Sequence, residues 1–196
     1  MQQKNNPLII ILLLSILVLA AGCREHRAVR FLWPDLDDPY VEVAREWSRS
    51  GSLYSGIETD AIVHATFKSR QWRRAYIEKR AEVYGLTKNE QAELYSIAVD
   101  SMDRETEVFL SIFSPKPEQA RIRFSDPLWS IFIQTEDEKI YPLEIRAVRK
   151  PLAKLQTFYP YAGQWSHNYI LRFPEPTRDS LVMIMTGPLG RLEFDW

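Results

Sequence analysis

The second half of the chain is divided into short apolar runs, and this division restricts the fold more than any other feature. From Glu105 to Trp196 the runs are separated by Pro, Gly, Asp and Glu. Apolar and polar residues alternate most clearly in 120–124 and 191–196, so each of these segments is expected to turn one face towards a core. Short strands of alternating apolar and polar residues, separated by turn-forming residues, predict an antiparallel sandwich or barrel.

We predict about eight strands, the first at 61–68 and seven more at 107–113, 120–124, 129–134, 140–148, 168–173, 180–186 and 191–194. This number is sufficient for two sheets. The predicted fold is therefore mainly β, an immunoglobulin-like antiparallel β-sandwich with an α-helical hairpin insertion between the first and second strands. The Cys…Trp…Cys pattern of true immunoglobulin domains is absent, so the comparison concerns architecture alone.

The hairpin is predicted at about 69–102, where the periodicity becomes helical. Gly85 is placed as a helix C-cap, and Thr87 with Glu90 forms the capping box of a second helix. The expected apolar faces are Trp72, Ala75, Tyr76 and Val83 on the first helix, and Leu94, Ile97, Ala98 and Met102 on the second. A shorter helix is expected to start at Asp38 and Pro39 and to end before the Ser- and Gly-rich residues 50–56.

The first 22 residues have the three-part layout of a secretory signal. Lys4 lies in a polar start, an apolar run covers Leu8 to Leu19, and the small residues Ala20, Ala21 and Gly22 precede Cys23. A transmembrane anchor is the alternative, but the uncharged stretch 7–22 is shorter than the ~20 residues that a spanning helix needs.

Residues 19–23, Leu-Ala-Ala-Gly-Cys, resemble the lipobox of bacterial lipoproteins. The resemblance implies that a diacylglyceryl group is attached to the Cys23 thiol, that residues 1–22 are cleaved off, and that the new amino terminus is acylated, for example with palmitate. Two or more chains hold a protein stably at a membrane. In this family an Asp after the Cys favours inner-membrane retention. The residue here is Arg24, so we favour the outer membrane, facing the periplasm.

The predicted organisation is a lipoprotein signal peptide at 1–22, a lipidated tether with a leading loop at 23–39, and a single domain at 40–196. Residues 23–196 hold 24 Lys and Arg against 26 Asp and Glu. Nucleic-acid binders carry a strong basic excess, so a nucleic-acid partner is not expected. Cys23 is the single cysteine, so no internal disulfide can form.

Two segments are candidate binding sites. Residues 68–74 surround a Trp with cations, and the candidate contacts for an anionic lipid or phosphosugar are Arg70, Trp72, Arg73 and Arg74. The alternative is a solvated helix face with Trp72 in the core. The aromatic loop 158–165 offers Tyr159, Tyr161 and Trp165 to a sugar or protein, or else plugs one end of the sandwich.

The sequence shows no convincing catalytic, cofactor or metal motif. His26, His64 and His167 lack zinc-site spacing, and the acidic groups 35–38 and 136–138 lack the spacing of a calcium loop. Our leading hypothesis is a membrane-anchored envelope lipoprotein, a non-enzymatic binding or structural module for another envelope protein or a polysaccharide. The alternatives are a cell-envelope hydrolase with carboxylates assembled by the fold, and a small-ligand carrier with a cavity between the sheets.

Overall fold

The computed structural model describes residues 38–123 and 127–196. All of these except Asp38 belong to the compact unit Pro39–Trp196. The predicted signal peptide and Cys23 lie outside the described residues. The element order is α3 (Pro39–Glu46), β1 (Ser48–Ser55), β2 (Glu58–Phe67), α4 (Arg70–Tyr84), α5 (Lys88–Met102), β3 (Thr106–Phe113), β4 (Ser130–Gln134), β5 (Lys139–Ile140), β6 (Glu144–Ala147), α6 (Leu152–Phe158), β7 (His167–Phe173), β8 (Val182–Gly187) and β9 (Gly190–Asp195).

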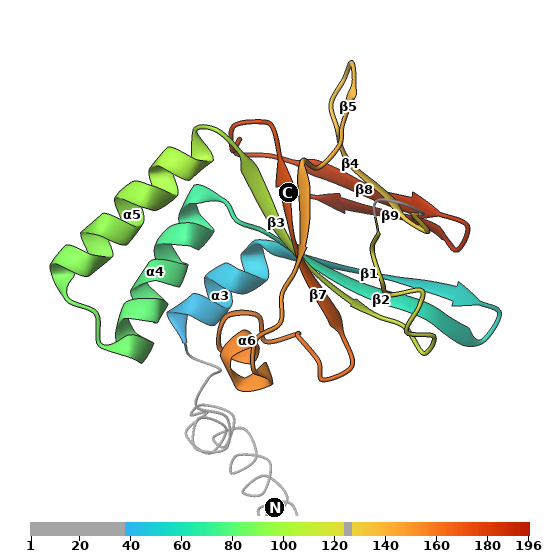
Figure 1. The fold of residues 1–196 in the computed structure, drawn as a ribbon, viewed down its shortest axis with the longest axis horizontal. Helices are drawn as coiled ribbons and strands as arrows, with labels where there is room; N and C mark the ends of the chain where they lie inside the picture. The colour runs from blue at the N-terminus through green and yellow to red at the C-terminus, as the bar shows by residue number, and fades with distance from the viewer. Residues whose placement is uncertain (1–37, 124–126) are drawn as a thin grey trace, which may run out of the picture. The chain divides into compact units, whose positions relative to one another are not determined.

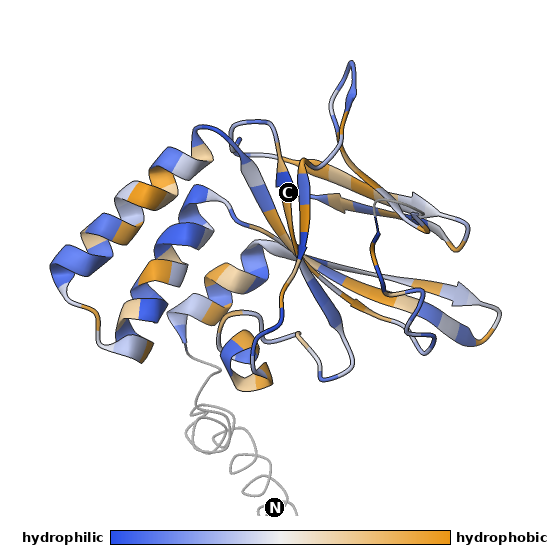
Figure 2. Ribbon diagram, viewed as in Figure 1, coloured by the Kyte–Doolittle hydropathy of each residue, from blue (hydrophilic) through white to orange (hydrophobic). Residues whose placement is uncertain are grey.

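The described strands form two antiparallel sheets (Figure 1). One has the order β1-β2-β3-β7-β6 and the other the order β5-β4-β8-β9. Side chains of both sheets contribute to one hydrophobic core, and apolar residues are correspondingly concentrated along the strands in Figure 2. The prediction of a mainly β fold is confirmed.

The five-stranded sheet is covered on both faces because its strands alternate between two clusters of buried side chains. In β2, Ala61, Val63 and Ala65 are fully buried in the core shared by the two sheets. In β3, Phe109 points to the opposite face, where it belongs to a second cluster with Trp72 and other residues of the helices. The period of two thus places one set of residues between the sheets and the next set beneath the helices.

The helical hairpin is confirmed, together with the two caps predicted for its connector. Gly85 takes the left-handed conformation, with φ 66°, as the C-cap of α4. At the start of α5, the Thr87 hydroxyl accepts a hydrogen bond from the Glu90 N–H at 3.3 Å, and the Glu90 carboxylate accepts one from the Thr87 N–H at 2.7 Å. The hairpin follows the second described strand, not the first as predicted, because β1 was not foreseen.

Replacing Thr87 by Ala should destabilise the protein by about 1 kcal/mol, since the hydroxyl that satisfies an unpaired helix N–H is lost. Urea denaturation of the purified chain should show a lower midpoint with an unchanged slope. The Thr87→Ser variant keeps a capping hydroxyl and should stay close to the unsubstituted protein. Equal midpoints for all three proteins would contradict the stabilising role of the cap.

No strand was predicted before residue 61, but residues 48–55 form the edge strand β1. The sequence SRSGSLYS carries too few apolar residues to show alternation. Its small residues serve close packing against β9: a Cβ atom on Gly51 would lie 2.8 Å from Leu192 Cδ2. The strand is therefore specified by its neighbours and not by its own pattern.

Two other predicted strands are corrected. Residues 120–123 form no strand, and 124 lies outside the described residues. Apolar and polar residues alternate there although the backbone does not pair with another strand. The Tyr169 hydroxyl instead donates to the Ala120 carbonyl and accepts from the Ile122 N–H. The strand predicted at 140–148 is divided into β5 and β6, which belong to different sheets. Helix α6 was not predicted, whereas the short helix α3 was.

Candidate functional site

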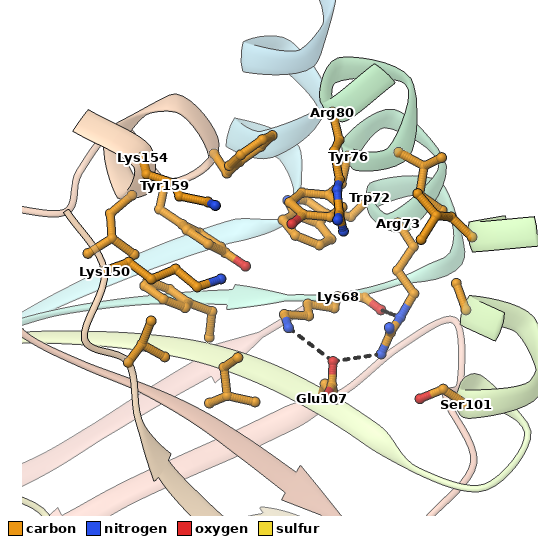
Figure 3. A pocket seen from close by; sticks show the side chains of 18 of the residues that line it. Lys68, Trp72, Arg73, Tyr76, Arg80, Ser101, Glu107, Lys150, Lys154 and Tyr159 are labelled. Atoms are coloured by element: carbon orange, nitrogen blue, oxygen red, sulfur yellow. Dashed lines mark hydrogen bonds and ion pairs between the residues drawn. The ribbon is translucent and has the colours of Figure 1, made fainter. Parts of the chain in front are cut away.

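A cavity of 520 Å³ lies between the helical hairpin, the outer face of the five-stranded sheet and α6 (Figure 3). Its volume falls within the range of ~300 to 1,000 Å³ typical of small-ligand sites. The hairpin contributes Trp72, Arg73 and Arg80 from α4, and β3 contributes Glu107. Lys150 and Lys154 close the side next to α6. We call this cavity the hairpin cleft.

Cations dominate the charge of the hairpin cleft. Its lining contains one carboxylate, Glu107, and five basic side chains, which are Lys68, Arg73, Arg80, Lys150 and Lys154. The near-neutral charge of the whole chain conceals this local excess. A concentration of one sign of charge within a pocket attracts ligands of the opposite sign.

Two of the five cations share Glu107 at the base of the hairpin cleft. Lys68 Nζ lies 3.0 Å and Arg73 Nη2 lies 3.1 Å from the same oxygen, Oε2. Arg73 also donates through Nε to the Lys68 carbonyl at 3.0 Å. Burial lowers the pKa of Lys68, and Glu107 opposes that effect. Burial alone would raise the pKa of Glu107, but Lys68 and Arg73 hold it below its ordinary value.

The other three cations, Arg80, Lys150 and Lys154, make no ion pair with a carboxylate of the described residues. We call them the cation cluster. Burial lowers the pKa of Lys150, and the neighbouring charges of Lys154, Arg146 and Arg80 lower it further. Lys154 Nζ lies 5.3 Å from the centre of the Tyr84 ring. An anion placed among these side chains would relieve the repulsion between them.

Stacked aromatic rings form the floor of the hairpin cleft. The ring centres of Phe109 and Tyr159 lie 3.6 Å apart, those of Tyr159 and Trp72 lie 5.7 Å apart, and those of Trp72 and Tyr76 lie 5.0 Å apart. Burial raises the pKa of Tyr159 well above its ordinary value, so its hydroxyl stays protonated. The indole N–H of Trp72 is buried and has no hydrogen-bond partner in the described chain. The floor therefore offers apolar ring faces to a ligand.

The structure brings together three of the seven predicted binding residues. Trp72, Arg73 and Tyr159 all line the hairpin cleft. Trp72 is 2% exposed, which agrees with the alternative that places it in the core. Arg70 and Arg74 are exposed and lie outside the cleft lining.

The remaining predicted residues, Tyr161 and Trp165, do not belong to the hairpin cleft. Trp165 is exposed. Tyr161 stacks on His64 with ring centres 4.8 Å apart, and its hydroxyl is hydrogen-bonded to Thr66. Tyr159 and Tyr161 thus cover the outer face of the five-stranded sheet and do not plug an end between the two sheets.

No sequence pattern indicated the cation cluster or the role of Glu107. Arg80 lies on a predicted helix outside its expected apolar face, and Lys150 and Lys154 lie in a segment for which no helix was predicted. One signal was present, since Lys150, Pro151 and Lys154 place two cations one turn apart at a helix start. Nothing in the sequence connects that turn to Arg80.

A second hollow contains the acidic group 136–138, as well as Glu175 and Asp195. Residues 136–138 connect β4 and β5 in a turn, in which the Thr135 N–H donates to the Glu138 carbonyl at 3.0 Å. Arg178 in this hollow pairs with Glu175 at 3.3 Å. Within residues 38–123 and 127–196, no three His, Asp or Glu side chains are placed to hold a metal ion.

Among the described residues, no helix is long and apolar enough to span a membrane. Comparisons with protein-family models, with curated proteins and with solved structures give no match for this chain.

Proposed function

We propose that this chain is a lipid-anchored bacterial envelope protein whose domain is a non-enzymatic binding module, and that the hairpin cleft takes a small acidic ligand. One observation carries the binding site: five cations and a single carboxylate surround an aromatic-floored cavity. The anchor rests on Cys23 and the small residues before it. Attachment at the outer membrane, facing the periplasm, rests on Arg24.

Binding is favoured over catalysis by how the charged groups are arranged. The one carboxylate in the hairpin cleft is occupied by two cations, Lys68 and Arg73. A hydrolase working with two carboxylates would need a second one beside it. The small-ligand carrier is the alternative that the cavity supports. The cavity lies outside the five-stranded sheet, however, and not between the sheets where we expected a carrier's site.

The proposal includes an immunoglobulin-like sandwich as the scaffold. Two antiparallel sheets with a common core support it. The helices then lie on the outer face of one sheet. The ligand site therefore lies outside the sandwich and not in the core between its sheets.

The test is isothermal titration of the full-length protein in lipid nanodiscs with 1-naphthyl phosphate, a soluble probe with an anionic group and an aromatic body. We expect saturable binding to one site per chain. In the cleft triple variant, Arg80→Gln, Lys150→Gln and Lys154→Gln, affinity should fall about tenfold or more, equivalent to about 1.4 kcal/mol. Neutral naphthalenemethanol should bind more weakly than the phosphate.

A matched control separates local charge from overall charge. The control triple variant replaces the exposed Lys88, Arg104 and Lys116 by Gln, which removes the same number of charges outside the cleft lining. It should bind the probe as the unsubstituted protein does. Failure of the probe to bind, or equal loss in both variants, would refute the hairpin cleft as an acidic-ligand site.

A further inference from the structure

The apolar face of α5 is only partly covered by the rest of the described chain, since Leu94 and Ala98 are half-buried and Ile97 is exposed. Leu94, Ile97 and Ala98 were expected to pack in a core with Met102, but among the described residues of α5 only Met102 is buried. The other three line the hairpin cleft, and Ile97 is 58% exposed. We call Leu94, Ile97 and Ala98 the α5 wall. An apolar ligand group lying along this wall would remove its surface from water, which is favourable.

The cation cluster indicates the charge of the ligand. Arg80, Lys150 and Lys154 supply three positive charges without a carboxylate partner among the described residues. A carboxylate would neutralise one of them, whereas a phosphate monoester carries roughly −1.5 to −2 at pH 7. Arg binds phosphate in a bidentate manner and Lys binds it as a point charge, so both residue types suit this group.

Figure 3 shows Lys150 and Lys154 on one side of the cavity and Ser101, from α5, at the other. Lys150 and Lys154 of the cation cluster thus belong to a different part of the chain from the α5 wall, and this arrangement suits an amphiphile. A purely polar anion would leave the α5 wall in water, and a neutral lipid would leave the cation cluster uncompensated.

We propose that the ligand of the hairpin cleft is a single-chain amphiphile with a phosphate monoester head, its head held by the cation cluster and its acyl chain lying along the α5 wall. This inference rests on the proposed function, because it names the class of acidic ligand that the same site takes. A free phosphate ester without an acyl chain is the alternative that the test separates from it.

The test is competition measured by native mass spectrometry of the full-length protein released from detergent micelles. Oleoyl lysophosphatidic acid, oleoyl lysophosphatidylcholine, oleic acid and glycerol phosphate are present at equal concentration. We expect the lysophosphatidic acid adduct to exceed each of the others about tenfold. The cleft triple variant should lose this preference, and the control triple variant should keep it.

The acyl chain is tested separately by the Ile97→Ser variant, which removes apolar surface from the α5 wall without adding a charge. It should weaken the lysophosphatidic acid adduct about tenfold. The matched control is Ala92→Ser, at an exposed position of α5 outside the cleft lining, which should leave that adduct unchanged.

Three results would overturn the inference. Equal adducts of the two lysolipids would exclude head-group selection, and an oleic acid adduct as strong would exclude the phosphate. A glycerol phosphate adduct as strong as that of lysophosphatidic acid would identify a free phosphate ester as the ligand. In each case 1-naphthyl phosphate binding that depends on the cation cluster would still support the proposed function, so the two proposals fail separately.

Discussion

Replacing Glu107 by Gln should destabilise the protein by about 3 to 5 kcal/mol, the usual cost of removing one partner from a buried ion pair. The carboxylate is the only anion in contact with Lys68 and Arg73 in the described chain, and all three side chains are at most 14% exposed. Gln leaves two buried cations without compensation. Urea denaturation of the full-length protein measures the loss as a lower midpoint.

The Glu78→Gln variant is the matched control. Glu78 pairs with Arg74 at 3.3 Å on the same hairpin, but both side chains are more than 60% exposed. Exposed pairs contribute about 0 to 1 kcal/mol, so this variant should unfold close to the unsubstituted protein. Similar midpoints for the two variants would show that the shared carboxylate does not stabilise the base of the hairpin cleft.

The pH dependence of the Glu107 effect has a definite sign. Because Lys68 and Arg73 hold the pKa of Glu107 below its ordinary value of about 4.3, its contribution is fully present above that pH. It is lost as pH falls through the lowered pKa. The difference in unfolding free energy between the unsubstituted protein and the Glu107→Gln variant should therefore shrink in acid. It should also shrink in alkali, since burial lowers the pKa of Lys68 and lets the variant discharge it.

The parts of the fold that could be predicted are those specified by residues close together in the chain. The hairpin connector is determined by the left-handed backbone of Gly85 and by the hydrogen bonds between Thr87 and Glu90. All three residues lie within a few positions of each other in the chain. The strands 107–113 and 168–173 were found because each is a short run rich in apolar β-branched and aromatic residues. These features depend on local chemistry, which the sequence displays directly.

The parts that were missed depend on partners far along the chain. Strand β1 forms because β2 pairs with it and because β9 packs closely at Gly51. The hairpin cleft combines Lys68 and Arg73, which the basic motif did indicate, with Lys150 and Lys154, some eighty residues later. The residues of the α5 wall were predicted with the correct helical period but were wrongly assigned to a protein core. An apolar helix face predicts burial without saying whether protein or ligand covers it.

Replacing Cys23 by Ser should abolish lipid attachment and release the domain from the membrane. The thioether to the diacylglyceryl group requires the Cys sulfur, and the acyl chains supply the attachment to the membrane. Labelled palmitate should enter the unsubstituted protein and not the Cys23→Ser variant. After membrane fractionation, the variant should lose its acyl-dependent attachment. Label in the variant, or unsubstituted protein found wholly in the soluble fraction, would refute the anchor.

Arg24→Asp provides the control that keeps the thiol. In the lipoprotein family that residues 19–23 resemble, Asp after the lipidated Cys favours the inner membrane, so this variant should still take up palmitate but move from the outer-membrane to the inner-membrane fraction of a density gradient. Lipidation and sorting are then separated, because one variant loses the label and the other changes only its position. An unchanged position for Arg24→Asp would leave Cys23 as the anchor and contradict the outer-membrane assignment based on Arg24.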